Sequence, residues 1–92
     1  MATFNNVTIE DVWVDVTTLS GAITTSPYAI QNVGVDAVYL KESANAPTTD
    51  DGAVLFGAQF GELSKAEIQA NSNKMWAKVV GSGRKTTLAV YS

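Results

Sequence analysis

Residues 74–91 read KMWAKVVGSGRKTTLAVY, and their pattern is that of two β-strands joined by a short turn. The flanking residues 74–80 and 86–91 are rich in the β-branched, aromatic and other apolar residues that favour strands. The five residues between them, GSGRK, are polar and contain two glycines. A connection of this length predicts that the two strands pair as an antiparallel hairpin. This end of the chain therefore indicates an antiparallel β-protein.

Apolar residues continue with strand-like spacing through the middle of the chain. They predict strands over residues 28–32 (YAIQN), 35–43 (VDAVYLKES) and 53–56 (AVLF), with a polar loop over residues 43–52 (SANAPTTDDG). Residues 63–71 fit either a strand or a helical turn, because Ser64 and Glu67 form the S-x-x-E pattern of a helix N-terminus. The strand agrees better with the neighbouring pattern.

A strictly alternating segment lies nearer the N-terminus. Residues 11–17 read DVWVDVT, which predicts a strand with Val12, Val14 and Val16 on its core face. Trp13 then faces outward or towards a second layer.

The first ten residues include the large apolar side chains Phe4, Val7 and Ile9, separated by Asn and Thr. They indicate an extended N-terminal arm or a short edge strand within residues 1–10. With the strands above, the chain contains about seven strands, no long helix and turn signals at short intervals, which is typical of β-sandwiches and barrels. We therefore predict an all-β fold, with residues 1–92 forming one antiparallel β-sandwich or barrel-like domain.

The composition excludes most kinds of active site. The 92 residues include no cysteine and no histidine, and only 16% of them are charged. The chain therefore has no disulfides, no Cys or His metal ligands, no thiol nucleophile and no histidine general base. We predict a protein that is not an enzyme, with no catalytic residues, no cofactor and no bound metal.

Charge and hydropathy restrict the partners. A net charge of −3 argues against nucleic acid, since such binding depends on basic residues. No apolar run approaches the ~20 residues of a spanning helix, and residues 1–6 lack the charge and apolar core of a leader peptide. We expect no membrane partner and synthesis in the cytoplasm. Thr, Ser and Asn together outnumber the charged residues, which favours packing against other proteins.

Two loops resemble ligand-binding motifs. Residues 81–87 (GSGRKTT) are similar to the end of a phosphate-binding loop, but a strand follows where that loop needs a helix. A turn that exposes Arg84 and Lys85 to an acidic partner is the better interpretation. Residues 48–52 (TTDDG) have two adjacent acids, whereas calcium loops space their acids apart. A solvated turn is therefore expected there.

Two groups of side chains are candidate sites. The acidic residues are Glu10, Asp11 and Asp15. Their spacing does not demand the paired carboxylates of acid–base catalysis, and surface charges are commoner. The large aromatic residues are Trp13, Tyr39 and Trp76. They would bind sugars if exposed together on one face, but a core or interface role is more usual.

Several motifs together resemble a group of small β-sandwich virion proteins of tailed bacteriophages. They are IQNVG at residues 30–34, VYLKESANAP at 38–47, DGAVL at 51–55, MWAK at 75–78, GSG at 81–83 and LAV at 88–90. The resemblance implies a capsid decoration (cement) protein that binds the major capsid protein or another virion protein on the phage head surface, often as a trimer. The alternatives are a tail- or fibre-associated virion protein and a host-surface glycan-binding module. The expected interface residues are Phe4, Val7, Ile9, Trp13, Arg84 and Lys85, with the N-terminal arm adding a strand to a neighbour's sheet.

Overall fold

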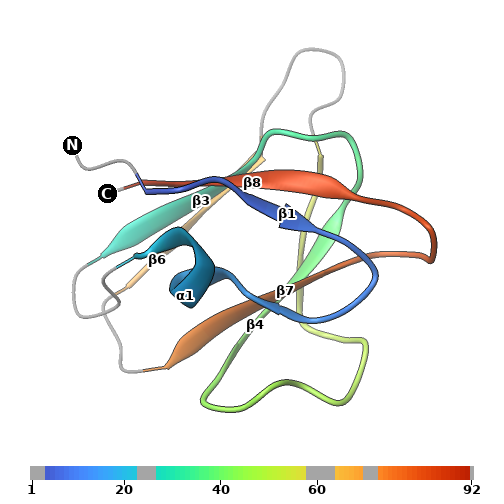
Figure 1. The fold of residues 1–92 in the computed structure, drawn as a ribbon, viewed down its shortest axis with the longest axis horizontal. Helices are drawn as coiled ribbons and strands as arrows, with labels where there is room; N and C mark the ends of the chain where they lie inside the picture. Colours follow the sequence, from blue (N-terminus) through green and yellow to red (C-terminus); the bar gives the residue numbers. More distant parts are fainter. Residues whose placement is uncertain (1–3, 23–26, 58–63, 70–72, 92) are drawn as a thin grey trace.

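Eight strands and one short helix form the part of the chain that the computed structural model describes, residues 4–22, 27–57, 64–69 and 73–91 (Figure 1). In chain order they are β1 Val7–Ile9, β2 Val14–Asp15, α1 Val16–Ser20, β3 Tyr28–Asn32, β4 Val38–Ser43, β5 Ala53–Leu55, β6 Ser64–Ile68, β7 Lys74–Val79 and β8 Thr86–Tyr91.

The strands form two four-stranded sheets. One sheet, here sheet A, has the order β1-β8-β3-β6, and the other, sheet B, has the order β2-β7-β4-β5. Every paired strand is antiparallel to its neighbour. The predicted all-β antiparallel sandwich is confirmed.

The pairing is nested from the ends of the chain inwards. Strand β1 pairs with β8, β2 with β7, β3 with β6 and β4 with β5. Such nesting describes one long hairpin rolled up so that its strand pairs alternate between two sheets. This connectivity is that of an eight-stranded jelly roll. It brings the two ends of the chain together in sheet A, where β1 lies beside β8 (Figure 1).

The core lies between the sheets and follows from the alternation of each strand. The buried residues of β7 are Met75, Ala77 and Val79, and those of β8 are Thr86, Leu88 and Val90. The remaining core side chains are Val7, Ile9, Val16, Tyr28, Ile30, Val38, Leu40 and Leu55. Burial of these apolar surfaces is the main force that holds the two sheets together.

The predicted C-terminal hairpin is wrong, although both of its strands are present. Strand β7 belongs to sheet B and β8 to sheet A, so residues 80–85 cross between the sheets. Gly83 supports this turn with a φ of 71°, which side chains disfavour. A short connection and alternating burial fit a hairpin and a crossover equally well, because each strand only needs one face on the core.

The predicted strand over residues 11–17 is also largely wrong. Only β2 is a strand, Val12 is 59% exposed, and α1 follows at once, although Val16 lies in the core and Val14 packs against it as expected. The Asp15 side chain caps this helix by accepting a hydrogen bond from the Thr18 backbone N–H at 3.1 Å. Gly21 ends it with a φ of 82°. The two caps stabilise one helical turn in a segment whose valine spacing favours a strand.

Residues 7–9 form an edge strand of their own sheet rather than an arm. They pair with β8, and the side chains of Val7 and Ile9 are buried. The half-buried Phe4 extends this contact, because its backbone N–H donates to the Val90 carbonyl at 3.0 Å. Residues 1–3 of the predicted arm lie outside the described part of the chain.

The strands predicted in the middle of the chain are confirmed as β3, β4 and β5. For residues 63–71 the strand interpretation is confirmed over residues 64–68, where β6 pairs with β3 along its whole length. Five paired residues outweigh the local S-x-x-E signal for a helix. Residues 63, 70 and 71 lie outside the described residues.

Candidate interaction surfaces

The outer face of sheet B carries aromatic and basic side chains. The register places Trp76 between Asp15 and Lys41 on adjacent strands, and Tyr39 between Lys78 and Val54. The Trp13 ring lies against Tyr39, with centroids 6.5 Å apart and planes tilted by 38°. We call the surface formed by Trp13, Tyr39, Lys41, Trp76 and Lys78 the aromatic–basic face.

The loop between β4 and β5 is fastened to the aromatic–basic face by two ion pairs. Lys41 Nζ lies 2.6 Å from Asp51 Oδ1, and Lys78 Nζ lies 2.6 Å from Asp50 Oδ1. Thr49 Oγ1 also donates to Asp51 at 2.8 Å. The hydrogen bond from Lys41, with that from Thr49, holds the pKa of Asp51 below its usual value. Asp50 and Asp51 therefore form ion pairs with lysines, which agrees with the turn expected at residues 48–52.

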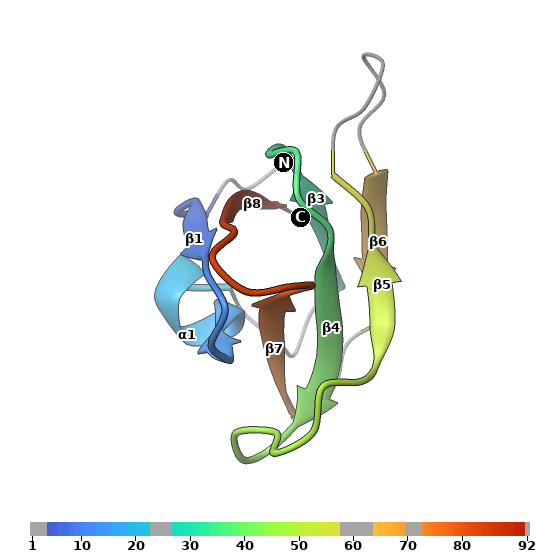
Figure 2. The same ribbon diagram turned by 90° about the vertical axis from the view of Figure 1, so that its right-hand side faces the viewer.

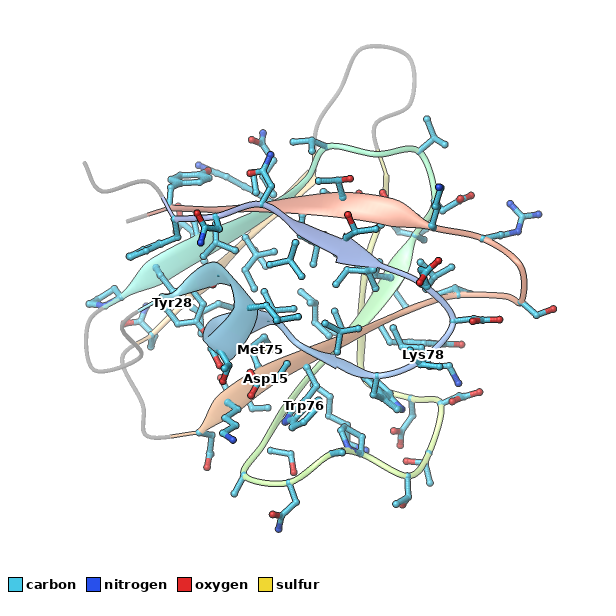
Figure 3. All side chains as sticks on the ribbon, in the orientation of Figure 1. Asp15, Tyr28, Met75, Trp76 and Lys78 are labelled. Carbon is cyan, nitrogen blue, oxygen red and sulfur yellow. The ribbon has the colours of Figure 1, made fainter. Side chains whose placement is uncertain are left out.

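The three aromatic residues that are candidates for sugar binding all lie outside the core. The indole N–H of Trp76 donates to the Ser43 carbonyl at 2.9 Å, which fixes this ring over the start of the loop. Figure 3 shows Trp76 and Lys78 on the side of β7 that faces away from Met75. A shallow cavity of about 210 Å³ lies beside Tyr39 and Lys78. Its walls include Asp11, Asp50 and Ser82.

The acidic residues near the N-terminus do not form a pair. Asp15 caps α1 and lies 3.6 Å from Lys74 Nζ. Partial burial acts to raise the pKa of Asp15, but hydrogen bonds from Thr18 and Thr17 and the charge of Lys74 outweigh it and lower the pKa. Asp11 Oδ2 instead accepts from the Gly83 backbone N–H at 3.3 Å.

Glu10 contributes through its backbone, because its carbonyl accepts from the Val79 N–H at 2.9 Å. Within the part of the chain that the structure describes, no three His, Cys, Asp or Glu side chains are grouped to hold a metal ion. The separate contacts of Glu10, Asp11 and Asp15 are structural.

The crossover turn exposes the two basic residues predicted there. Arg84 is exposed but engaged, since its Nη1 lies 3.1 Å from Asp36 Oδ1. Lys85 is exposed and forms no ion pair with another described residue. Strand β8 follows the turn, so the helix that a phosphate-binding loop requires is missing from these described residues.

The outer face of sheet A is different in character. Adjacent strands place Thr8 opposite Thr87, Gln31 opposite Ala89 and Ala29 opposite Tyr91. We call this surface the smooth face, because its side chains are uncharged and mostly small. Among the described strand residues of sheet A, Lys65 and Glu67 on edge strand β6 are the only charged ones on this outer side.

A further apolar patch lies at one end of the sandwich. Val35 is 68% exposed and Phe56 is 61% exposed, and Val33 also faces solvent. Gly57 packs against the Val35 backbone so closely that a Cβ at this position would clash. The loop before β4 and the end of β5 are therefore held together, with apolar side chains outward.

The predicted interface residues do not form one surface. Val7 and Ile9 belong to the core, so they are not available to a partner of the folded chain. Trp13 lies on the outer side of sheet B, and Arg84 and Lys85 lie in the crossover turn. The sequence pattern did not indicate the sheet or the face on which each of these residues would lie.

Sequence reasoning missed Asn32, whose side chain makes four hydrogen bonds with other described residues. Its amide Nδ2 donates to the carbonyls of Asp36 at 2.8 Å and Leu55 at 3.3 Å. Its Oδ1 accepts from the Gly34 N–H at 3.2 Å and from Thr86 Oγ1 at 2.7 Å. The fully buried side chain thus joins β3, β5 and β8. The N-x-G sequence at residues 32–34 was the signal that could have indicated this role.

Tyr28 is a second buried polar residue, at 4% exposure. Its hydroxyl has no hydrogen-bond partner among the described residues. Burial, together with the negative charges of Glu42 and Asp15, raises the pKa of Tyr28 to about 12. The hydroxyl therefore remains protonated and inert at neutral pH.

Comparison with models of protein families, with curated proteins and with solved structures finds no match to this chain. No helix in the described ranges is long and apolar enough to cross a membrane. The surfaces described above therefore carry the functional argument.

Proposed function

We propose that the protein is a non-enzymatic structural protein of a tailed-bacteriophage virion, namely a decoration protein that binds the major capsid protein on the head surface. The observation that carries the proposal is the smooth face on a jelly-roll sandwich. Jelly rolls are frequent in viral capsid proteins. The motif resemblance to virion proteins supports the same role.

The smooth face is suited to packing against a large protein surface. Burying charged groups without partners costs free energy, and this face presents none away from β6. Each contact is individually weak, but oligomers engaging a repeated lattice bind several sites at once. A homo-oligomer on the head would stabilise the shell by linking neighbouring capsid subunits.

The experiment compares particles that contain and lack the protein. Cryo-EM of the complete virion should place it on the outer head surface, and heads without it should lose integrity at lower temperature. Ala89→Glu on the smooth face should abolish binding to heads, whereas Val54→Glu on the opposite sheet should not. Equal heat stability of both particles, with the protein found only at the tail, would replace this proposal with the tail-associated one.

One observation favours a second candidate, a host-surface glycan-binding module. The aromatic–basic face exposes parts of Trp13, Tyr39 and Trp76, and Tyr39 lines a cavity together with Asp11 and Asp50. Aromatic rings stack on sugar rings, and carboxylates accept hydrogen bonds from sugar hydroxyls. Binding of host glycans by the purified protein, lost in Tyr39→Ala but kept in Ala89→Glu, would support this candidate over a purely structural role.

A further inference from the structure

The edges of the two sheets differ in length and in charge. Strands β1, β2 and β5 end three of the four edges and are each only two or three residues long. Strand β6 ends the fourth and has five residues. No other strand of the described residues pairs with its outer side, and Figure 2 shows it at the margin of the sandwich beside β5. In an edge strand, alternate residues direct their backbone N–H and C=O groups away from the sheet.

The sequence of β6 is complementary to itself when two copies run antiparallel. It reads Ser64-Lys65-Ala66-Glu67-Ile68, so its central residue is Ala66. Pairing two copies with Ala66 on a two-fold axis places Lys65 of each copy opposite Glu67 of the other. Opposite charges in directly opposed positions stabilise a strand pair, and a small residue at the axis avoids a clash.

We propose that two copies of this chain associate through antiparallel pairing of their β6 strands, which joins the two A sheets into one. The interface is isologous, because the same strand is used by both copies. Lys65 and Glu67 lie 3.6 Å apart within one strand and both are exposed, so each can exchange this intrastrand partner for the opposite charge on a second copy. The proposal is independent of the virion role.

The pairing would also complete the cover of the core at this edge. Ala66 and Ile68 pack against the core but are only partly buried. A second strand beside β6 removes more of their surface from water. Because five residues bury a small area, the dimer is expected to be weak, with a dissociation constant on the order of 0.1 mM.

Charge reversal tests the register directly. In Glu67→Lys, each copy presents lysines at positions 65 and 67, and in Lys65→Glu each presents glutamates. Both variants should dimerise roughly tenfold more weakly than the wild type in sedimentation-velocity experiments over 10 µM to about 1 mM protein. Mixing the two variants should restore association, because every opposed pair then joins a lysine to a glutamate. Glu10→Lys, the same charge change at an exposed position outside β6, should leave dimerisation unchanged.

Urea unfolding of each variant shows whether the domain remains folded, since these exposed substitutions should change its stability by less than about 0.5 kcal/mol. A wild-type protein that stays monomeric across the concentration range would overturn the proposal. A trimer, or a mixture of variants that associates no better than either alone, would do the same. Failure of head binding with an intact dimer would instead count against the virion role only.

Discussion

Replacing Asn32 with alanine should be the most damaging single substitution of a polar side chain. The change removes both hydrogen bonds donated by Nδ2 and both accepted by Oδ1. The substitution leaves the Leu55 carbonyl and the Thr86 hydroxyl without this hydrogen-bond partner, and both belong to buried residues. Gly34 and Asp36 also lose a hydrogen bond, but they are partly exposed and can bind water. A buried polar group without a partner costs about 1–3 kcal/mol. Counting the two buried groups gives a loss of roughly 4 kcal/mol.

This loss is large for a chain of 92 residues. Domains of this size have a free energy of unfolding of roughly 5–14 kcal/mol. A loss of about 4 kcal/mol should lower the melting temperature by roughly 15–30 °C. Urea unfolding followed by tryptophan fluorescence measures the change, and Asn6→Ala, at an exposed asparagine, should stay within about 0.5 kcal/mol of the wild type. A cost below 1 kcal/mol for Asn32→Ala would refute the assignment.

The stability of the Asn32→Asp variant should depend on pH. The variant keeps an oxygen that accepts from Thr86, but its second oxygen faces two carbonyls. Burial and these carbonyls should raise the folded-state pKa of the new carboxyl above its unfolded value of about 3.9. A raised pKa means that the protonated form is favoured in the folded state, so stability is lost as the pH rises. The deficit relative to wild type should therefore grow between pH 3 and pH 7, and a constant deficit would contradict the buried position.

Three further substitutions test separate contacts. Gly57→Ala should destabilise the protein by at least about 2 kcal/mol in urea unfolding, because its Cβ would overlap the backbone of Val35. Tyr28→Phe should raise the free energy of unfolding by about 1 kcal/mol, since it removes a buried hydroxyl without a described partner; a fall would show that this hydroxyl is paired. Asp15→Asn should cost about 1 kcal/mol at pH 7, because the amide loses the second oxygen that accepts from Thr18 Oγ1 and the charge that faces Lys74. Because the folded-state pKa of Asp15 is lowered, its stabilisation is present above the unfolded pKa and lost as the pH falls, so the deficit should close towards pH 2.

The strands were predictable where one face of a segment is buried along its whole length. Val38 and Leu40 alternate with Tyr39 in β4, and the structure buries the first two and leaves the third half-exposed. The same rule failed at Val12, which is 59% exposed, while Val16 does lie in the core and Val14 packs against it. The strand itself ends at Asp15, because this residue and Gly21 cap a helical turn. Local capping thus overrides alternation in a segment too short to gain much from pairing.

Which strands pair with each other could not be predicted from the alternation of apolar and polar residues. A strand of sheet A and a strand of sheet B both direct alternate residues into one shared core, so their patterns are identical. The polar contacts that distinguish the sheets are long-range, such as the bond from Thr86 to Asn32. The aromatic–basic face also depends on long-range contacts, because Trp13 and Tyr39 come together only when β2 and β4 lie on either side of β7. Residue types that can form a surface are thus visible in the sequence, whereas their meeting depends on topology.

The outer faces of the two sheets differ in charge, and this difference affects how each face can bind a partner. Lys41, Lys74 and Lys78 pair with acids on or beside the outer face of sheet B. That face is covered in part by the loop before β5 and already has its electrostatic partners. The smooth face has no charged groups away from its edge, where Lys65 and Glu67 form the intrastrand ion pair that a second copy can replace. A partner that buries the smooth face away from β6 therefore desolvates no ion pair of the described residues. A partner that buries the aromatic–basic face must desolvate the Lys41–Asp51 and Lys78–Asp50 pairs. This difference in desolvation cost is why protein binding is assigned to sheet A, and it predicts that high salt weakens the β6 dimer more than attachment through the smooth face.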